Sequence, residues 1–200
     1  MYRKDRKREF FTIKARKQGY PARSIYKLEE IDKKYSFLKK DNVVLDLGCA
    51  PGSWLMYILS KVGENGLVVG VDINDINIKS EEIRNGIVFI KKDIGDLRIG
   101  ELRDISLGYH VVVSDLAPAT TGIKLVDVKR SSELCLGALN IAKQILFVNG
   151  IFVCKMFEGE LTGDFINLLK RNFNFVKEFR PKAVLKKSKE IYIIAKGFFK

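Results

Sequence analysis

Short apolar runs separated by helical segments fill the chain from residue 43 onward. Strand-like runs occur at 43–47, 67–71, 87–90, 111–113, 151–154, 174–178 and 191–195. Helical spacing is found at 54–61, 127–147 and 161–171. Buried strands that alternate with helices indicate a parallel sheet covered on both faces, while the last two runs, which have no helix between them, indicate a hairpin. The pattern therefore predicts an α/β fold with a mostly parallel seven-stranded sheet and one antiparallel strand.

The N-terminal region shows a different pattern. Residues 1–19 read as a basic helical arm, and a second helix is predicted to start at Pro21, because proline is tolerated in a first helical turn. Ile25, Leu28 and Ile31 repeat at helical spacing and form a core-facing stripe, which leaves Lys27 outside it. Since no linker or repeat divides the chain, we expect one domain over 1–200 that carries this arm.

Polar residues follow the predicted strands where each strand ends. Asp46 lies inside the first strand, and Asp72, Asp93, Asp115 and Lys155 come at or just after the ends of four others. A single aspartate in such a position is usually a helix cap or a turn former. Five polar residues placed this way are better explained by a ligand, which binds beyond the carboxyl ends of strands in open α/β sheets.

The loop after the first strand has the composition of a cofactor-binding turn. Gly48 permits a close backbone approach to a ligand, and Gly52 precedes a helix whose free N–H groups can face an anion. Asp72, 20 residues after Gly52, stands where an acid accepts hydrogen bonds from a ribose diol. A dinucleotide fold is the nearest alternative, but Pro51 lacks an N–H for a pyrophosphate. We therefore favour a nucleoside-type cofactor, with Asp93 at the adenine amino group.

The net charge of +12 is concentrated at the two ends of the chain. Residues 1–40 carry 14 Lys and Arg against 5 Asp and Glu, and residues 170–200 carry 10 against 2. Two basic segments around a mildly acidic centre suit the phosphate backbone of a nucleic acid, although a basic surface without a partner is the simpler alternative.

The cysteine and histidine counts and the lengths of the apolar runs bear on cellular location, metal binding and membrane insertion. Three cysteines without a CxxC pair are typical of an intracellular protein, and His110 is the single histidine. No apolar run approaches the roughly 18 residues of a membrane span. We expect a cytoplasmic monomer without a metal site or a membrane partner.

Six segments together resemble the FtsJ/RrmJ family of ribose 2′-O-methyltransferases. These segments are ARSIYKLEEI, VVLDLGCAPGSW, GVDI, SDLAP, VCKMFEGE and KSKEIYIIAKGF, in the family's order from about residue 20 to residue 198. Each segment by itself is weak evidence for the family, but the six together are specific to it and cover nearly the whole chain. The resemblance implies a Rossmann-like class I methyltransferase that uses S-adenosylmethionine.

The resemblance also implies the site residues. The family's Lys-Asp-Lys-Glu tetrad falls on Lys27, Asp115, Lys155 and Glu190, with Lys155 as the base that takes the ribose proton. The cofactor-binding residues implied by the resemblance or by the loop are Asp46, Gly48, Pro51, Gly52, Ser53, Trp54, Asp72, Asp93 and Asp115. Ser53 departs from the second glycine of many members, and we expect this departure to have little effect.

Several functions remain open at the level of sequence. A compact chain of this kind is similar to family members that methylate a uridine of large-subunit ribosomal RNA, with rRNA or the large ribosomal subunit as partner. A tRNA anticodon-loop or mRNA-cap methyltransferase, a small-molecule methyltransferase and a catalytically silent RNA-binding assembly factor are the alternatives. The basic ends argue against the small-molecule enzyme, and the intact tetrad argues against the silent factor.

Overall fold

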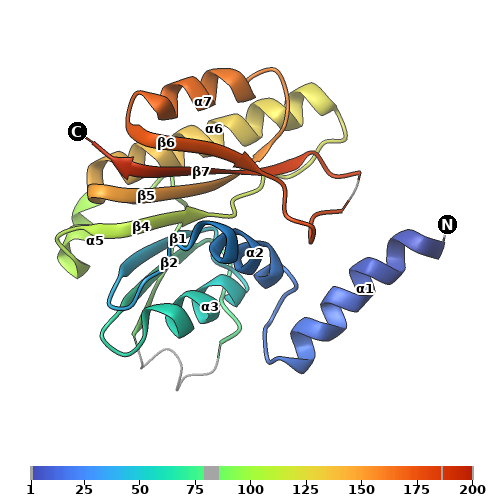
Figure 1. Ribbon diagram of the computed structural model, residues 1–200, viewed down its shortest axis with the longest axis horizontal. Coiled ribbons are helices and arrows are strands. Elements are labelled where there is room, and N and C mark those ends of the chain that lie inside the picture. The colour runs from blue at the N-terminus through green and yellow to red at the C-terminus, as the bar shows by residue number, and fades with distance from the viewer. Residues whose placement is uncertain (1, 79–85, 186, 200) are drawn as a thin grey trace.

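The computed structural model describes residues 2–78, 86–185 and 187–199, and it contains one seven-stranded sheet with helices on both faces (Figure 1). The strands are β1 (Val43–Leu47), β2 (Leu67–Asp72), β3 (Ile87–Lys91), β4 (Tyr109–Ser114), β5 (Leu146–Phe157), β6 (Phe173–Phe179) and β7 (Glu190–Phe198). Their order is β3-β2-β1-β4-β5-β7-β6, and β7 runs antiparallel to both of its neighbours while the other paired strands are parallel. The predicted sheet, including its single antiparallel strand, is confirmed.

Six helices lie in the described part of the chain. They are α1 (Tyr2–Lys17), α2 (Ile25–Tyr35), α3 (Ser53–Val62), α5 (Ile99–Ile105), α6 (Lys124–Ile145) and α7 (Thr162–Lys170). One apolar core packs α5, α6 and α7 against one face of the sheet, and a second packs α2 and α3 against the other face. None of the described helices is long and apolar enough to cross a bilayer.

The basic arm forms α1, which projects from the side of the molecule next to α2 (Figure 1). Ala15 is buried, and the ring of Phe11 lies 5.2 Å from that of Tyr26. The Tyr26 hydroxyl donates a hydrogen bond of 2.7 Å to Gln18 just after the helix. A few apolar contacts near its C-terminal end therefore hold the arm on α2.

Two predicted helix boundaries are wrong, and one helix was not predicted. The second helix begins at Ile25 rather than Pro21, because the backbone of Ala22 is hydrogen-bonded to the Ser53 side chain instead of continuing a helix. The helix predicted to end at 147 stops at Ile145, and residues 146 and 147 open β5. Helix α5 was not predicted, since it has seven residues and Leu102 is its one fully buried side chain.

Candidate active site

Strand register brings three of the site residues into a row at the carboxyl edge of the sheet. In the β4–β5 pair Ser114 lies opposite Cys154, so Asp115, which follows β4, lies beside Lys155 of β5. In the β5–β7 pair Lys155 lies opposite Tyr192. The three side chains thus come from adjacent strands.

Lys155 and Asp115 form a largely buried ion pair. Lys155 Nζ lies 3.1 Å from Asp115 Oδ1, and it also donates to the Asp115 backbone carbonyl. The two side chains are 7% and 17% exposed, so the pair is poorly screened by solvent. Burial acts to raise the pKa of Asp115, but the Lys155 and Lys27 cations and the Tyr192 hydroxyl outweigh it, and the pKa lies below its usual range.

Lys27 and Glu190 form the second ion pair, with 2.6 Å between Nζ and Oε1. Lys27 reaches the sheet edge because the apolar stripe of α2 packs on the core and Glu30, one turn further on, binds the C-terminal hairpin. The Glu30 carboxylate accepts hydrogen bonds of 2.6 Å and 2.9 Å from the backbone N–H groups of Lys182 and Ala183. Two side chains of α2 therefore attach it to the segment that leads into β7.

Tyr192 joins the two ion pairs, and sequence reasoning missed it. Its hydroxyl lies 2.6 Å from Asp115 Oδ1 and 3.0 Å from Glu190 Oε1, and the residue is fully buried. Burial and the two carboxylates raise its pKa well above the usual value, so the phenol keeps its proton for hydrogen bonding. The signal was available, because residues 190 and 192 lie two apart on a strand and share a face.

The four predicted tetrad residues therefore belong to one continuous network. The contacts run from Lys27 through Glu190, Tyr192 and Asp115 to Lys155. Two lysines and two carboxylates balance in charge, which allows them to lie close together with little exposure.

The glycine loop lies beside this network, at the carboxyl end of β1. Gly48 and Gly52 have φ angles of +80° and +110°, which favour glycine, and the Ala50–Pro51 peptide bond is cis. A Cβ on Gly52 would lie 2.6 Å from the Ile78 side chain, and one on Gly48 would lie 2.9 Å from that of Leu116. The loop therefore requires glycine at both positions.

Asp46, in β1 just before the loop, is unusual in its burial. Its side chain is completely buried, and neither carboxylate oxygen has a hydrogen-bond partner within the described residues. Burial, followed by the charges of Asp115 and Asp72, raises its pKa well above the ordinary value. A buried acceptor without a partner is costly, so this position fits a ligand that brings a cation or hydrogen-bond donors.

The two other aspartates bind nearby backbone. Asp72 Oδ2 accepts a hydrogen bond of 2.9 Å from Ala50 N, while its Oδ1 accepts one of 2.8 Å from Asn74 N. Asp93 is exposed, and its Oδ1 accepts from Gly95 N at 2.7 Å. Asp72 thereby ties the end of β2 to the glycine loop, and each carboxylate retains unused lone pairs.

Ser53 and Trp54 point into the protein. The Ser53 hydroxyl accepts from Ala22 N at 2.7 Å and lies 3.0 Å from Ala22 O, and the Trp54 indole donates to the Ser24 carbonyl at 3.0 Å. These bonds fix the segment before α2 to the start of α3. Their side chains thus connect the glycine loop to the helix that carries Lys27, and a contact of either residue with a cofactor stays a prediction.

Comparison with known proteins identifies the family. The model of the FtsJ-like methyltransferase family matches residues 20–198. The chain belongs to the FtsJ-like methyltransferase family. It is 43% identical over 187 residues to a ribosomal RNA large subunit methyltransferase E of Desulfatibacillum aliphaticivorans, with 94% of this chain and 89% of the relative covered. The corresponding protein of Lawsonia intracellularis is 41% identical over 194 residues, with 96% and 95% covered.

A solved structure agrees with this assignment. A ribosomal RNA methyltransferase from Plasmodium falciparum superposes with a TM-score of 0.78 at 32% identity, covering 90% of this chain and 98% of its own. The family and the fold expected from the motifs are both confirmed, and the protein is a methyltransferase.

Proposed function

We propose that this methyltransferase transfers a methyl group from S-adenosylmethionine to a ribose 2′-hydroxyl of RNA, in a uridine of large-subunit ribosomal RNA. The observation that carries the proposal is the network of two lysine–carboxylate pairs joined by Tyr192, next to the glycine loop. The relatives named as ribosomal RNA large subunit methyltransferases support the choice of RNA.

The loop residues fit S-adenosylmethionine. When bound, the cofactor supplies an electrophilic methyl group on a sulfonium. The unpartnered Asp46 carboxylate suits a cationic ligand, and it lies at the end of β1, directly before the glycine loop. Asp72 would accept from the ribose diol and Asp93 from the adenine amino group, as the sequence predicts.

The tetrad would prepare the ribose hydroxyl. Lys155 would hold the ribose hydroxyl and take its proton as general base, an effect worth typically 10²–10⁴-fold. Asp115 holds Lys155 at the end of β5, and Glu190 holds Lys27, whose ammonium would bind the 2′-oxygen or a neighbouring phosphate. Positioning of the two reactants contributes more to the rate than the base does.

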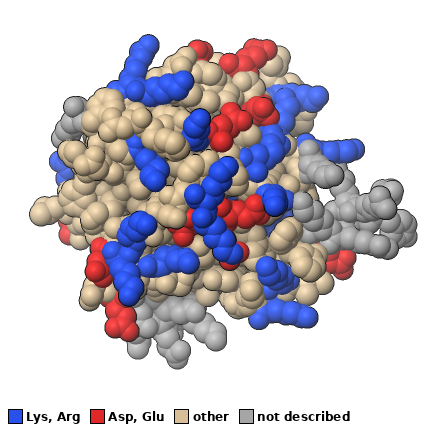
Figure 2. Space-filling view, viewed as in Figure 1, with Lys and Arg blue, Asp and Glu red and all other residues tan. Residues whose placement is uncertain are grey.

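The charge distribution supports an RNA substrate. The two basic ends of the sequence meet at the site, because Lys27 and Glu30 of the first segment bind Glu190 and the hairpin of the second. Lys and Arg side chains are spread over the face shown in Figure 2, with fewer acidic ones between them. We also infer that 1–200 acts as a single catalytic domain, as a cytoplasmic monomer, with the arm at 1–19 adding phosphate contacts.

The test is methyl transfer from labelled cofactor to large ribosomal subunits, naked rRNA and tRNA in parallel, followed by mapping of the modified nucleotide. We expect label on a ribose of large-subunit rRNA. Label confined to tRNA would indicate a tRNA anticodon-loop methyltransferase instead. No label on any RNA would refute the proposal.

A matched pair of variants tests the role of Lys155. Lys155→Ala should bind cofactor normally, measured by calorimetry, and lose methyl transfer by at least about a hundredfold. Lys143→Ala, at an exposed position near the end of α6, serves as the control and should retain both. Activity of Lys155→Ala close to that of the wild type would show that Lys155 is not the base.

A further inference from the structure

A cavity of about 370 Å³ lies between the first turns of α6, the segment before α7 and Lys189, which directly precedes the tetrad residue Glu190, and the proposed mechanism makes no use of it. Its size falls within the ~300–1,000 Å³ of small-molecule sites. It is lined by Lys124, Leu125, Val128, Lys129, Gly159, Glu160, Leu161 and Lys189.

Each segment around this cavity continues from a strand that carries a tetrad residue. Lys124 and Leu125 follow Asp115 through the loop after β4, and the 159–161 segment follows the end of β5, which carries Lys155. Lys189 directly precedes Glu190, so their Cα atoms are about 3.8 Å apart. The cavity is lined by the first turns of α6, a helix that packs on one face of the sheet, whereas Tyr192 packs with α2 and α3 on the other face, so the cavity lies across the sheet edge from the reacting centre.

The lining combines an apolar wall with cationic side chains. Leu125 is 69% exposed, and Leu161 is also exposed, although both are large and apolar. Gly159 closes the floor, because a Cβ there would lie 2.6 Å from Val128. Three lysines against one carboxylate, Glu160, give the rim a positive charge.

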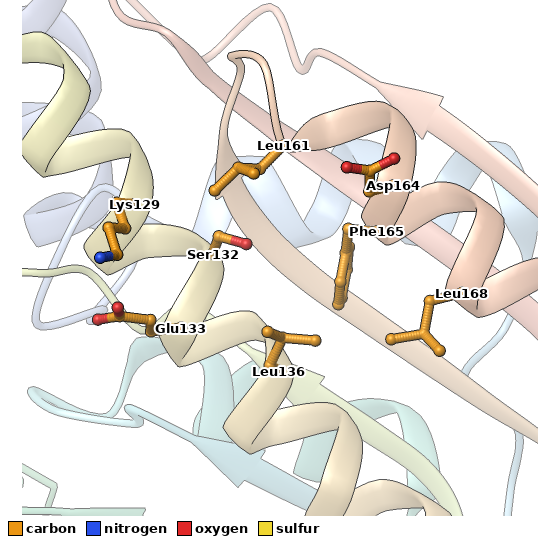
Figure 3. Close-up of a pocket in the computed structure, with 8 residues that line it drawn as sticks. All are labelled: Lys129, Ser132, Glu133, Leu136, Leu161, Asp164, Phe165 and Leu168. Carbon is orange, nitrogen blue, oxygen red and sulfur yellow. The ribbon is translucent and has the colours of Figure 1, made fainter.

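The neighbouring groove between α6 and α7 carries more acidic than basic side chains. In this groove Leu136, Phe165 and Leu168 face one another, and the carboxylates of Glu133 and Asp164 stand against one lysine, Lys129 (Figure 3). Two similar apolar cavities thus differ in the ligand that their charges favour, and only the one beside the tetrad suits an anion.

We propose that the cavity beside the tetrad binds an unpaired nucleotide next to the methylated one. The base lies against Leu125, Val128 and Leu161, while Lys124 and Lys189 contact the flanking phosphates. Single-stranded RNA is read by unstacked bases held on apolar or aromatic surfaces, and a phosphate backbone explains the lysines better than a protein partner does. This inference rests on the proposed RNA substrate.

The test uses a fluorescein-labelled single-stranded RNA of about twelve nucleotides, and the same ribose-phosphate chain without bases, in anisotropy titrations over a salt series. Leu125→Ser should weaken binding of the normal RNA about fivefold, leave binding of the abasic chain unchanged and keep the salt slope. Lys189→Ala should reduce the slope of log K against log salt by about 0.7. Leu136→Ser, on the same helix but in the other groove, is the matched control and should change neither.

Any other result contradicts the proposal that this cavity binds a nucleotide. Normal affinity of Leu125→Ser, or equal loss for the abasic chain, would show that no base binds there. Normal RNA binding with loss of methylation on assembled subunits alone would indicate a protein contact instead. Urea unfolding of each variant checks that it is folded. If the wild type neither binds nor methylates RNA, the proposed function itself fails, which is a result distinct from a failure of the cavity alone.

Discussion

The unpartnered carboxylate of Asp46 should make the protein without cofactor less stable as the pH rises. Its pKa in the folded state lies well above the value of 3.8 expected in the unfolded chain. Between these two values the folded state binds more protons than the unfolded state, so the free energy of unfolding falls with increasing pH. The contribution of Asp46 is therefore most favourable in acid and is lost as the pH rises from about 4 to the folded pKa.

Asp46→Asn isolates this effect, because asparagine has nearly the same shape and does not titrate. The free energy of unfolding of the wild type should fall relative to that of the variant by up to about 1.4 kcal/mol for each pH unit above about pH 4. The amide adds a constant offset, so the slope of the difference carries the information. Under the proposed function the same substitution should also weaken S-adenosylmethionine binding, since asparagine lacks the negative charge that Asp46 would present to a cationic ligand.

Urea unfolding followed by circular dichroism, at half-unit steps from pH 4.5 to 7.5, measures both curves. Asp104→Asn, at an exposed position near the end of α5, is the control for the chemical change. Parallel curves for the wild type and Asp46→Asn across this range would refute the reasoning, because they would mean that Asp46 titrates alike in both states.

Two further substitutions test the network. Tyr192→Phe keeps the buried ring and removes the hydroxyl that binds Asp115. We expect the free energy of unfolding in urea to fall by about 1.5 kcal/mol and single-turnover methylation to be at least tenfold slower. An unchanged rate would mean that the hydroxyl has a purely structural role. Glu30→Gln weakens the two bonds to the 182–183 backbone, so stability should fall by about 1 kcal/mol and the apparent KM for RNA should rise, because Lys27 is no longer held against the hairpin. Normal KM with reduced stability would separate the hairpin from RNA binding.

The sheet could be predicted from the sequence because its strands are short, apolar and regularly spaced. Helix α5 could not, since it has only seven residues and its core-facing side chains, Ile99, Leu102 and Ile105, are too few to show a helical period in the sequence. The start of α2 was misplaced for a different reason, because hydrogen bonds from Ser53 and Trp54, some 30 residues away, hold the chain ahead of Ile25 out of the helix. Such tertiary contacts leave no local pattern.

The site was predictable in part. The strand-end positions of Asp115 and Lys155 could be predicted, because ligands bind beyond the carboxyl ends of the strands in an open parallel sheet. The approach of Lys27 to Glu190 does not, because it depends on Glu30 capping a distant backbone segment. Tyr192 was overlooked because a tyrosine in an apolar strand reads as core, and only the carboxylates around its hydroxyl show otherwise.

The position of β7 has a consequence for how the protein is made. This strand is the last in the chain, yet it lies between β5 and β6 and carries Glu190 and Tyr192. On a ribosome, β6 would have no neighbour to pair with until β7 emerges and inserts, and such late, non-local pairing is slow. Completion of the sheet and completion of the reacting centre are then one event, so a chain shortened before β7 has neither, and partly synthesised copies would not methylate RNA.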